Sequence, residues 1–113
     1  MPHINIRVSK PLDTETKNKL QTEIANSMEL IPGKTASNTF ICISDSCSMY
    51  RDTQPIDAVF VDVRLYKNSP PESKKHFAER LFSIFEDTLK IPPSNVQINF
   101  VELPDWASGG NYF

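Results

Sequence analysis

The sequence lacks the features that define several large protein classes. No apolar run approaches the roughly 20 residues that a membrane-spanning helix needs. The first residues, MPHINIRVSK, have neither the basic start nor the apolar stretch of a secretion signal. Lysine and arginine form no block, and 12 basic residues stand against 14 acidic ones, which argues against nucleic-acid binding. We therefore expect a cytoplasmic protein with no membrane and no nucleic-acid partner.

Cysteine, histidine and glycine-rich motifs are also scarce. The two cysteines, Cys42 and Cys47, exclude a disulfide scaffold and cannot complete a zinc site alone. His3 and His76 show no pairing in the sequence, and we expect His76 on the exposed side of a helix. No phosphate-binding glycine loop or nucleophile elbow is present. Neither a metal nor an organic cofactor is implied.

Hydrophobic periodicity predicts four strands and two helices in 113 residues, a length that allows one domain. Apolar residues alternate with polar ones from Ile4 to Val8, which indicates a strand that begins near residue 2. The first helix is expected to start at Asp13 or Thr14 and to end near Gly33. The second helix follows a predicted capping box that begins at Ser69. The remaining strands are expected at residues 39–44, 58–66 and 96–101, and the tail 104–113 is expected to be irregular.

The two halves of the chain repeat. The run INIRVSK at residues 4–10 resembles VDVRLYK at residues 61–67, so that Arg7 and Arg64 are 57 residues apart. Ile41 and Ile98 have the same separation. We interpret this spacing as a duplicated β-α-β unit with right-handed crossovers, covering about 1–45 and 58–103 of a single domain 1–113. The predicted fold is α/β (α+β), with one four-stranded mixed sheet and two helices on one face.

Side-chain parity separates the two faces of this sheet. One face is wholly apolar and should lie under the helices. The other face is mixed, since Phe40 and Phe60 share it with charged residues such as Arg7, Asp62 and Arg64. Such a face on a small domain indicates a subunit interface, and the alternative is a partly solvated face that the tail covers.

Pro2 is the unusual chemical feature. Removal of the initiator methionine would leave a free prolyl amine at the head of the first strand, on the apolar side by parity. An α-amino group has a pKa of roughly 8, which burial or a nearby cation lowers toward neutrality. Such an amine can move a proton beside a carbonyl. The alternative is that Met-Pro is only a common way for a chain to start.

Together these features resemble the tautomerase superfamily, and within it macrophage migration inhibitory factor and its microbial relatives. The resemblance covers nearly the full length. It depends on Pro2, the duplicated layout and three short runs, which are Pro32-Gly33-Lys34, Ser48-Met49 and Leu89–Pro93 leading into Val96–Asn99. It implies a homotrimer with pockets at subunit boundaries, and a cofactor-independent isomerase that interconverts the keto and enol forms of a small 2-oxo acid such as phenylpyruvate.

The resemblance also assigns site residues. Pro2 takes the place of the base, Lys34 that of the active-site lysine, and Leu65 that of a pocket-lining isoleucine. Gln97 and Asn99 would reach the pocket from a neighbouring subunit. In the family an aromatic residue stands at the position of Gln97 and another at that of Asn38, so part of the aromatic wall is expected to be lost.

Two residues and the function keep alternatives. Lys34 could serve only to stabilise the end of the first helix. Arg64 could pair with Asp62 inside the assembly, or bind an anionic substrate as arginines do in other superfamily branches. The alternatives to tautomerisation are a non-catalytic protein that binds a protein partner or signals, and a hydratase-type or dehalogenase-type reaction.

Overall fold

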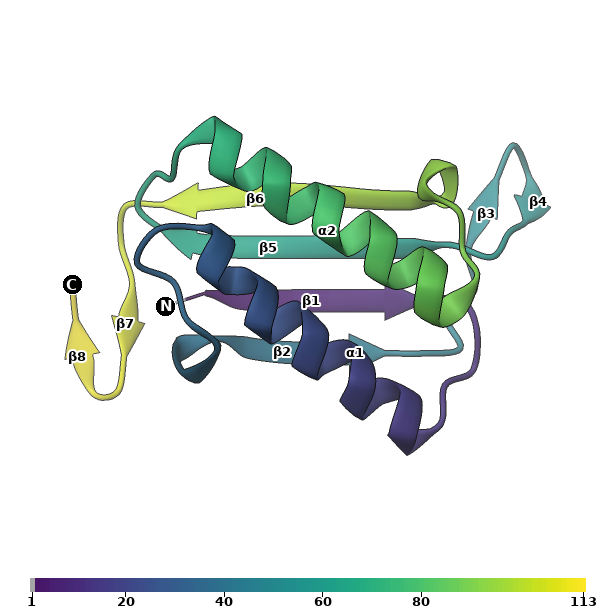
Figure 1. Ribbon diagram of the computed structural model, residues 1–113, viewed down its shortest axis with the longest axis horizontal. Helices are drawn as coiled ribbons and strands as arrows, with labels where there is room; N and C mark the ends of the chain where they lie inside the picture. The colour runs from purple at the N-terminus through teal and green to yellow at the C-terminus, as the bar shows by residue number, and fades with distance from the viewer. Residues whose placement is uncertain (1) are drawn as a thin grey trace.

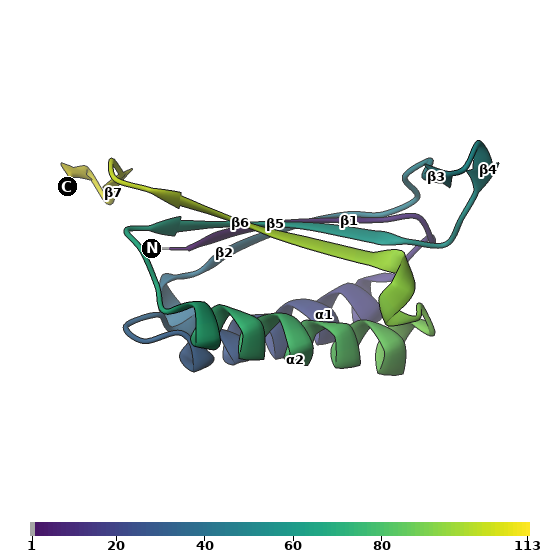
Figure 2. The same ribbon diagram turned by 90° about the horizontal axis from the view of Figure 1, so that it is seen from above.

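Four long strands form one sheet, and two helices cover one of its faces (Figures 1 and 2). A computed structural model describes residues 2–113. The strand order is β2-β1-β5-β6, and only the two central strands run antiparallel to each other. The strands are β1 (His3–Val8), β2 (Phe40–Ser44), β5 (Val59–Tyr66) and β6 (Val96–Leu103), and the helices are α1 (Thr14–Ser27) and α2 (Pro71–Leu89).

The connectivity confirms the duplicated β-α-β fold. In the first unit α1 connects β1 to its parallel neighbour β2, and in the second unit α2 connects β5 to its parallel neighbour β6. The two units meet where β1 and β5 pair antiparallel, from His3 opposite Arg64 to Val8 opposite Val59. Figure 2 shows both helices below the sheet and no element covering the opposite face. We call that uncovered side the open face.

The core lies between the sheet and the helices, as the alternation of apolar residues predicts. Every second side chain of the two central strands is buried there, and α2 contributes most of the opposing layer. The buried residues of these three elements are Ile4, Ile6, Val8, Val59, Val61, Val63, Leu65, Phe77, Leu81, Ile84, Phe85 and Leu89. The phenyl ring of Phe77 meets that of Phe100 on β6 edge-on, with the ring centroids 6.1 Å apart. The apolar face therefore holds the two layers together.

The helix ends confirm one local prediction and correct two. The Asp13 side chain accepts a hydrogen bond from the amide of Thr16 and caps α1, as expected. However, α1 ends at Ser27, and Gly33 lies beyond a short 3-10 turn, where its φ of +78° closes a loop. The capping box at Ser69 is wrong, because α2 begins at Pro71 with Pro70 as its cap. No helix in residues 2–113 is long and apolar enough to cross a membrane.

Two small hairpins extend from opposite ends of the sheet (Figure 1). The first joins β3 (Tyr50–Arg51) to β4 (Gln54–Pro55), and the second joins β7 (Ala107–Ser108) to β8 (Asn111–Tyr112). The tail is therefore not irregular throughout. Gly109 and Gly110 adopt φ values of +59° and +86°, the left-handed conformation that two-residue hairpin turns require. Asp52 and Thr53 adopt the same conformation in the first hairpin, with φ values of +52° and +62°.

Glu102, near the end of β6, explains why Ser69 does not cap the helix. Its carboxylate accepts hydrogen bonds from the amide of Ser69 and from Nζ of Lys74, the latter at 2.6 Å. The side chains of Glu102 and Lys74 are both less than one-fifth exposed. The hydrogen bond from Lys74, followed by that from the Ser69 amide, lowers the pKa of Glu102. The carboxylate thus connects β6 to the start of α2.

We expect Glu102→Gln to lower the free energy of unfolding by about 1–2 kcal/mol at pH 7, the range for hydrogen bonds to a charged group. Because the folded-state pKa of Glu102 is depressed, this stabilisation is complete above the ordinary carboxyl pKa of roughly 4.3. It is lost as the pH falls through the lower folded-state value. Urea unfolding of the wild type and the variant between pH 7 and pH 3 should show their difference shrinking with acid. A difference that stays constant over this range would contradict the assignment.

Candidate functional site

Pro2 lies at the head of the central strand β1, with strands on both sides of it. Its carbonyl oxygen accepts a hydrogen bond of 3.0 Å from the amide of Phe40, at the start of β2. The next residue, His3, pairs with Phe40 on one side and with Arg64 on the other. Pro2 is itself buried. The ladder thus fixes the strand head, and Pro2 is held in position by backbone contacts. The expected removal of Met1 concerns a residue outside the described range.

A cavity of about 260 Å³ opens beside Pro2. Three parts of the chain form its wall: the head of β1, the turn that leads into β2, and the start of the C-terminal hairpin. The lining residues are Pro2, His3, Asn38, Phe40, Trp106, Ala107 and Ser108. We call this the Pro2 cavity. Asn38 is therefore part of the wall, but Phe40 and Trp106 supply aromatic rings that the sequence analysis did not assign to the site.

Lys34 lies at the same end of the sheet but does not line the Pro2 cavity. Its Nζ donates a hydrogen bond of 3.3 Å to the carbonyl oxygen of Tyr66, the last residue of β5. The backbone amide of Lys34 donates to the carbonyl oxygen of Ile31 across the turn that Gly33 permits. The ammonium group is thus held near the end of β5, two residues beyond the position that faces His3.

The structure separates Leu65 and Arg64 to opposite sides of the sheet. Leu65 is fully buried in the core and does not line the Pro2 cavity. Arg64 is exposed on the open face, directly opposite His3. No ion pair involving Arg64 is present among residues 2–113, so Arg64 does not pair with Asp62 within one chain.

Gln97 and Asn99 lie on the open face of β6, far from Pro2 in the same chain. Gln97 faces Phe60 on β5, which in turn faces Arg7 on β1. Arg7 is five residues along β1 from Pro2, which corresponds to about 16 Å of strand. One chain therefore cannot bring Gln97 to the Pro2 cavity.

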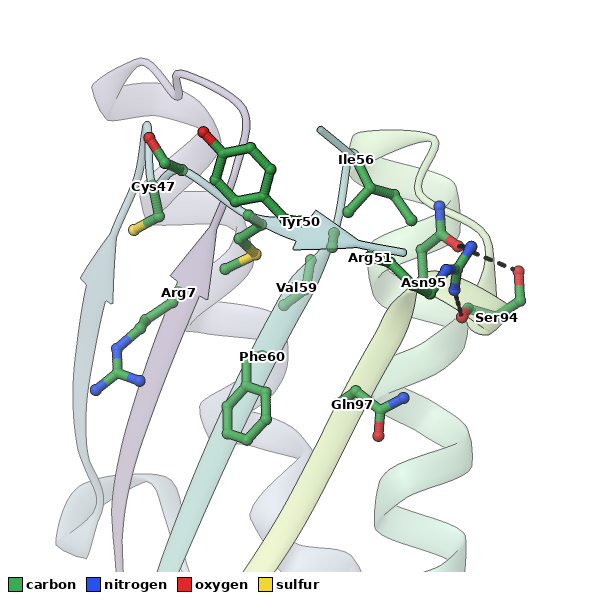
Figure 3. Close-up of a pocket in the computed structure, with 13 residues that line it drawn as sticks. Arg7, Cys47, Tyr50, Arg51, Ile56, Val59, Phe60, Ser94, Asn95 and Gln97 are labelled. Atoms are coloured by element: carbon green, nitrogen blue, oxygen red, sulfur yellow. Dashed lines mark hydrogen bonds between the residues drawn. The ribbon is translucent and has the colours of Figure 1, made fainter. Parts of the chain in front are cut away.

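A larger cavity of about 410 Å³ adjoins Gln97 at the head of β5 (Figure 3). Arg7, Phe60 and Gln97 project from three strands below the β3–β4 hairpin (Figure 3). The guanidinium of Arg51 donates hydrogen bonds of 2.9 and 3.0 Å to the carbonyl oxygen of Ser94 and to Oδ1 of Asn95. These bonds attach the hairpin to the start of β6 and fix the rim of the cavity.

The two cavities are built from equivalent positions of the repeat. Each residue of the Pro2 cavity has a counterpart 57 residues away that lines the larger cavity. The pairs are Pro2 with Val59, His3 with Phe60, Asn38 with Asn95, Phe40 with Gln97, Trp106 with Met49, Ala107 with Tyr50, and Ser108 with Arg51. The hairpins obey the same spacing. The repeat therefore includes the two hairpins, which the sequence boundaries of about 1–45 and 58–103 leave out.

The other chemical groups lie outside these cavities or stand alone. Residues 2–113 contain no cluster of three histidine, cysteine or acidic side chains placed to hold a metal. His76 is more than half exposed on α2, as predicted, with Nε2 3.3 Å from a carboxylate oxygen of Glu72. What distinguishes the Pro2 cavity chemically is a strand head that carries a proline, next to an imidazole and two aromatic rings.

Comparison with known proteins supports the fold strongly and the sequence weakly. No known protein family profile matches the chain, and neither does any curated protein sequence. Among solved structures, Leishmania major MIF2 superimposes with a TM-score of 0.91 at 18% identity, covering 100% of this chain and 97% of that one. A fused 4-OT, solved as an asymmetric trimer, gives a TM-score of 0.85 at 12% identity, with coverage of 97% and 94%. Malonate semialdehyde decarboxylase gives 0.73 at 19% identity, with coverage of 94% and 89%. The chain therefore has the fold of macrophage migration inhibitory factor and the tautomerases, as the sequence predicts.

Proposed function

We propose that this protein is a homotrimeric tautomerase that interconverts the keto and enol forms of a small 2-oxo acid such as phenylpyruvate. The observation that carries the proposal is the position of Pro2, which is buried at the head of β1 and lines a cavity with aromatic walls. The fold is shared with structurally similar enzymes such as malonate semialdehyde decarboxylase. We place the whole chain in one tautomerase-like domain that acts in the cytoplasm.

In this mechanism Pro2 is the base. Its secondary amine, freed from Met1, takes a proton from the carbon beside the ketone. The electron pair of that C–H bond forms the enol double bond, and the carbonyl oxygen takes up a proton. The reverse direction returns the proton from the prolyl ammonium to carbon. Burial of Pro2 disfavours its charged form, and so does the positive charge of Lys34 at the same end of the sheet.

Substrate binding is divided among the remaining residues. Lys34 attracts the carboxylate of the 2-oxo acid, and Leu65 supports the floor from the core. Phe40 and Trp106 offer flat apolar surfaces to an aryl substituent, which offsets the loss of aromatic residues at Asn38 and Gln97.

A trimer completes this site. Gln97 and Asn99 cannot reach Pro2 in one chain, but they can do so from a neighbouring chain. The open face carries exposed apolar residues suited to such an interface, and Phe40, Phe60 and Val101 are 73%, 37% and 36% exposed in the single chain. The similar fused 4-OT is itself a trimer. In the assembly the Pro2 cavity of one subunit would face the β6 strand of the next.

The test combines three measurements on one sample. Intact mass should show loss of Met1, sedimentation should give a trimer at micromolar concentration, and the enol of phenylpyruvate should ketonise faster than in buffer alone. His76→Gln serves as the control variant, since His76 is exposed on α2 and its change should alter none of these results. A stable monomer would refute the assembly. A trimer with a free prolyl amine but no activity would refute the reaction.

A further inference from the structure

His3 is a polar group of the Pro2 cavity that the proposed mechanism leaves unused. It follows Pro2 directly, lines the same cavity and is only partly buried. Among residues 2–113 no hydrogen bond or ion pair occupies its imidazole ring. At the equivalent position of the other repeat stands Phe60, which carries no polar atom. The imidazole is thus a feature of the Pro2 half alone.

Arg64 stands beside this imidazole on the open face. His3 and Arg64 are directly paired across β1 and β5, and directly opposed side chains of an antiparallel pair lie close enough to act together. The repeat gives an independent reason to place Arg64 at the cavity. Its counterpart Arg7 faces Phe60 in the same way and lines the larger cavity (Figure 3).

The charges around His3 leave this pair available to an anion. Phe40 faces His3 from β2, and Arg64 faces it from β5. The nearest acid on the open face is Asp62, which is opposite Asn5 and makes no ion pair with Arg64 in the described chain. Lys34 is held at the end of β5 by the carbonyl of Tyr66 and stands apart from the pair. Two separate positive positions therefore flank Pro2.

We propose that His3 and Arg64 form a second anion-binding subsite, and that the preferred substrate is a 2-oxo acid with a second carboxylate. Lys34 attracts the carboxylate next to the ketone. Arg64 and His3 bind the distal carboxylate through charge-assisted hydrogen bonds, for which guanidinium is the most suitable donor. This inference rests on the proposed function for its chemistry, but the binding of the distal carboxylate can be measured without turnover.

The kinetic test compares two acids that differ only in the distal group. Exchange of the protons beside the ketone with deuterated solvent is followed by NMR for 2-oxopentanedioate and for 2-oxopentanoate. We expect kcat/KM to be at least about tenfold higher for the diacid, since charge-assisted hydrogen bonds at the distal carboxylate are worth more than 1.4 kcal/mol. Arg64→Gln and His3→Gln should each reduce this preference, and Arg64→Lys should keep part of it. Equal rates for the two acids, or a preference that survives in Arg64→Gln, would overturn the proposal.

The binding test uses the fact that the chain has only two histidines. Glutarate, which has no ketone, is titrated into the wild-type protein while the imidazole signals of His3 and His76 are recorded. Only the His3 signal should move, because His76 lies on α2 next to Glu72. Pentanoate at the same concentration should have a much smaller effect.

The two tests separate the proposals. If neither acid exchanges but glutarate moves the His3 signal, the proposed reaction fails and the subsite stands. If both acids exchange equally and glutarate leaves His3 unaffected, the reaction stands and the subsite fails. If Arg64→Gln only dissociates the trimer and the wild-type His3 signal ignores glutarate, Arg64 is an interface residue and the subsite is refuted.

Discussion

Keeping one extra residue in front of Pro2 is expected to abolish ketonisation of phenylpyruvate enol, and Pro2→Ala is expected to reduce it by at least about a hundredfold. An acylated prolyl nitrogen has no basic lone pair, so the extended chain cannot accept a proton. Alanine would supply a primary amine at the same place, less constrained and so less well oriented. A well-placed acid or base contributes roughly 10²–10⁴ in rate.

The structure indicates that these changes spare the fold. The contact that holds the strand head is the hydrogen bond from the Phe40 amide to the Pro2 carbonyl oxygen, and neither change removes that oxygen. Circular dichroism and sedimentation of each form should therefore match the wild type. His76→Gln is again the matched control for activity. If the extended and the free forms ketonise the enol at the same rate, Pro2 is not the base.

Phe77→Ala is expected to cost about 3–5 kcal/mol of unfolding free energy, the range for truncating a buried phenylalanine. Phe77 is fully buried between α2 and the sheet, and its ring meets Phe100 edge-on. Truncation removes apolar burial, leaves a cavity and deletes the aromatic pair. A domain of this size has a total stability of about 5–15 kcal/mol, so the variant should be close to unfolding.

Two neighbouring changes calibrate this prediction. Phe77→Leu should cost clearly less than the alanine change, because much of the buried volume is retained. His76→Ala, one position away and more than half exposed, should change stability by less than about 0.5 kcal/mol. Urea unfolding at one fixed protein concentration is the appropriate measurement, since dissociation of an assembly would add to the midpoint. A cost below about 1 kcal/mol for Phe77→Ala would show that α2 does not pack as described.

The sheet and helices were predictable because burial imposes a period on the sequence. The alternation from Ile4 to Val8 and the spacing of 57 residues between Arg7 and Arg64 fix the strands, their faces and the duplication. Those signals are local, or are repeated within the chain, so one sequence is enough to detect them.

Features that depend on distant partners were missed. Ser69 reads as a helix cap, but its amide binds Glu102, which lies 33 residues away on another strand. Trp106 reads as an anchor for the tail, and only the three-dimensional fold brings it to Pro2. The C-terminal hairpin had a local signal, since Gly109-Gly110 between short polar segments favours a two-residue turn. The position of Gln97 relative to Pro2 depends on assembly, which no local pattern determines.

The equivalence of the two cavities has a consequence for how such a protein can evolve. Duplication copies walls, turns and strand heads, but it cannot copy a chain terminus. Val59 occupies in the second repeat the place of Pro2, yet its nitrogen is an ordinary peptide nitrogen joined to Ala58. In the proposed enzyme each polypeptide thus inherits two binding hollows and one reactive amine. Selection on proton transfer acts on only one of the two copies. The other is free to diverge, and Gln97 and Met49 now stand where the first copy has Phe40 and Trp106.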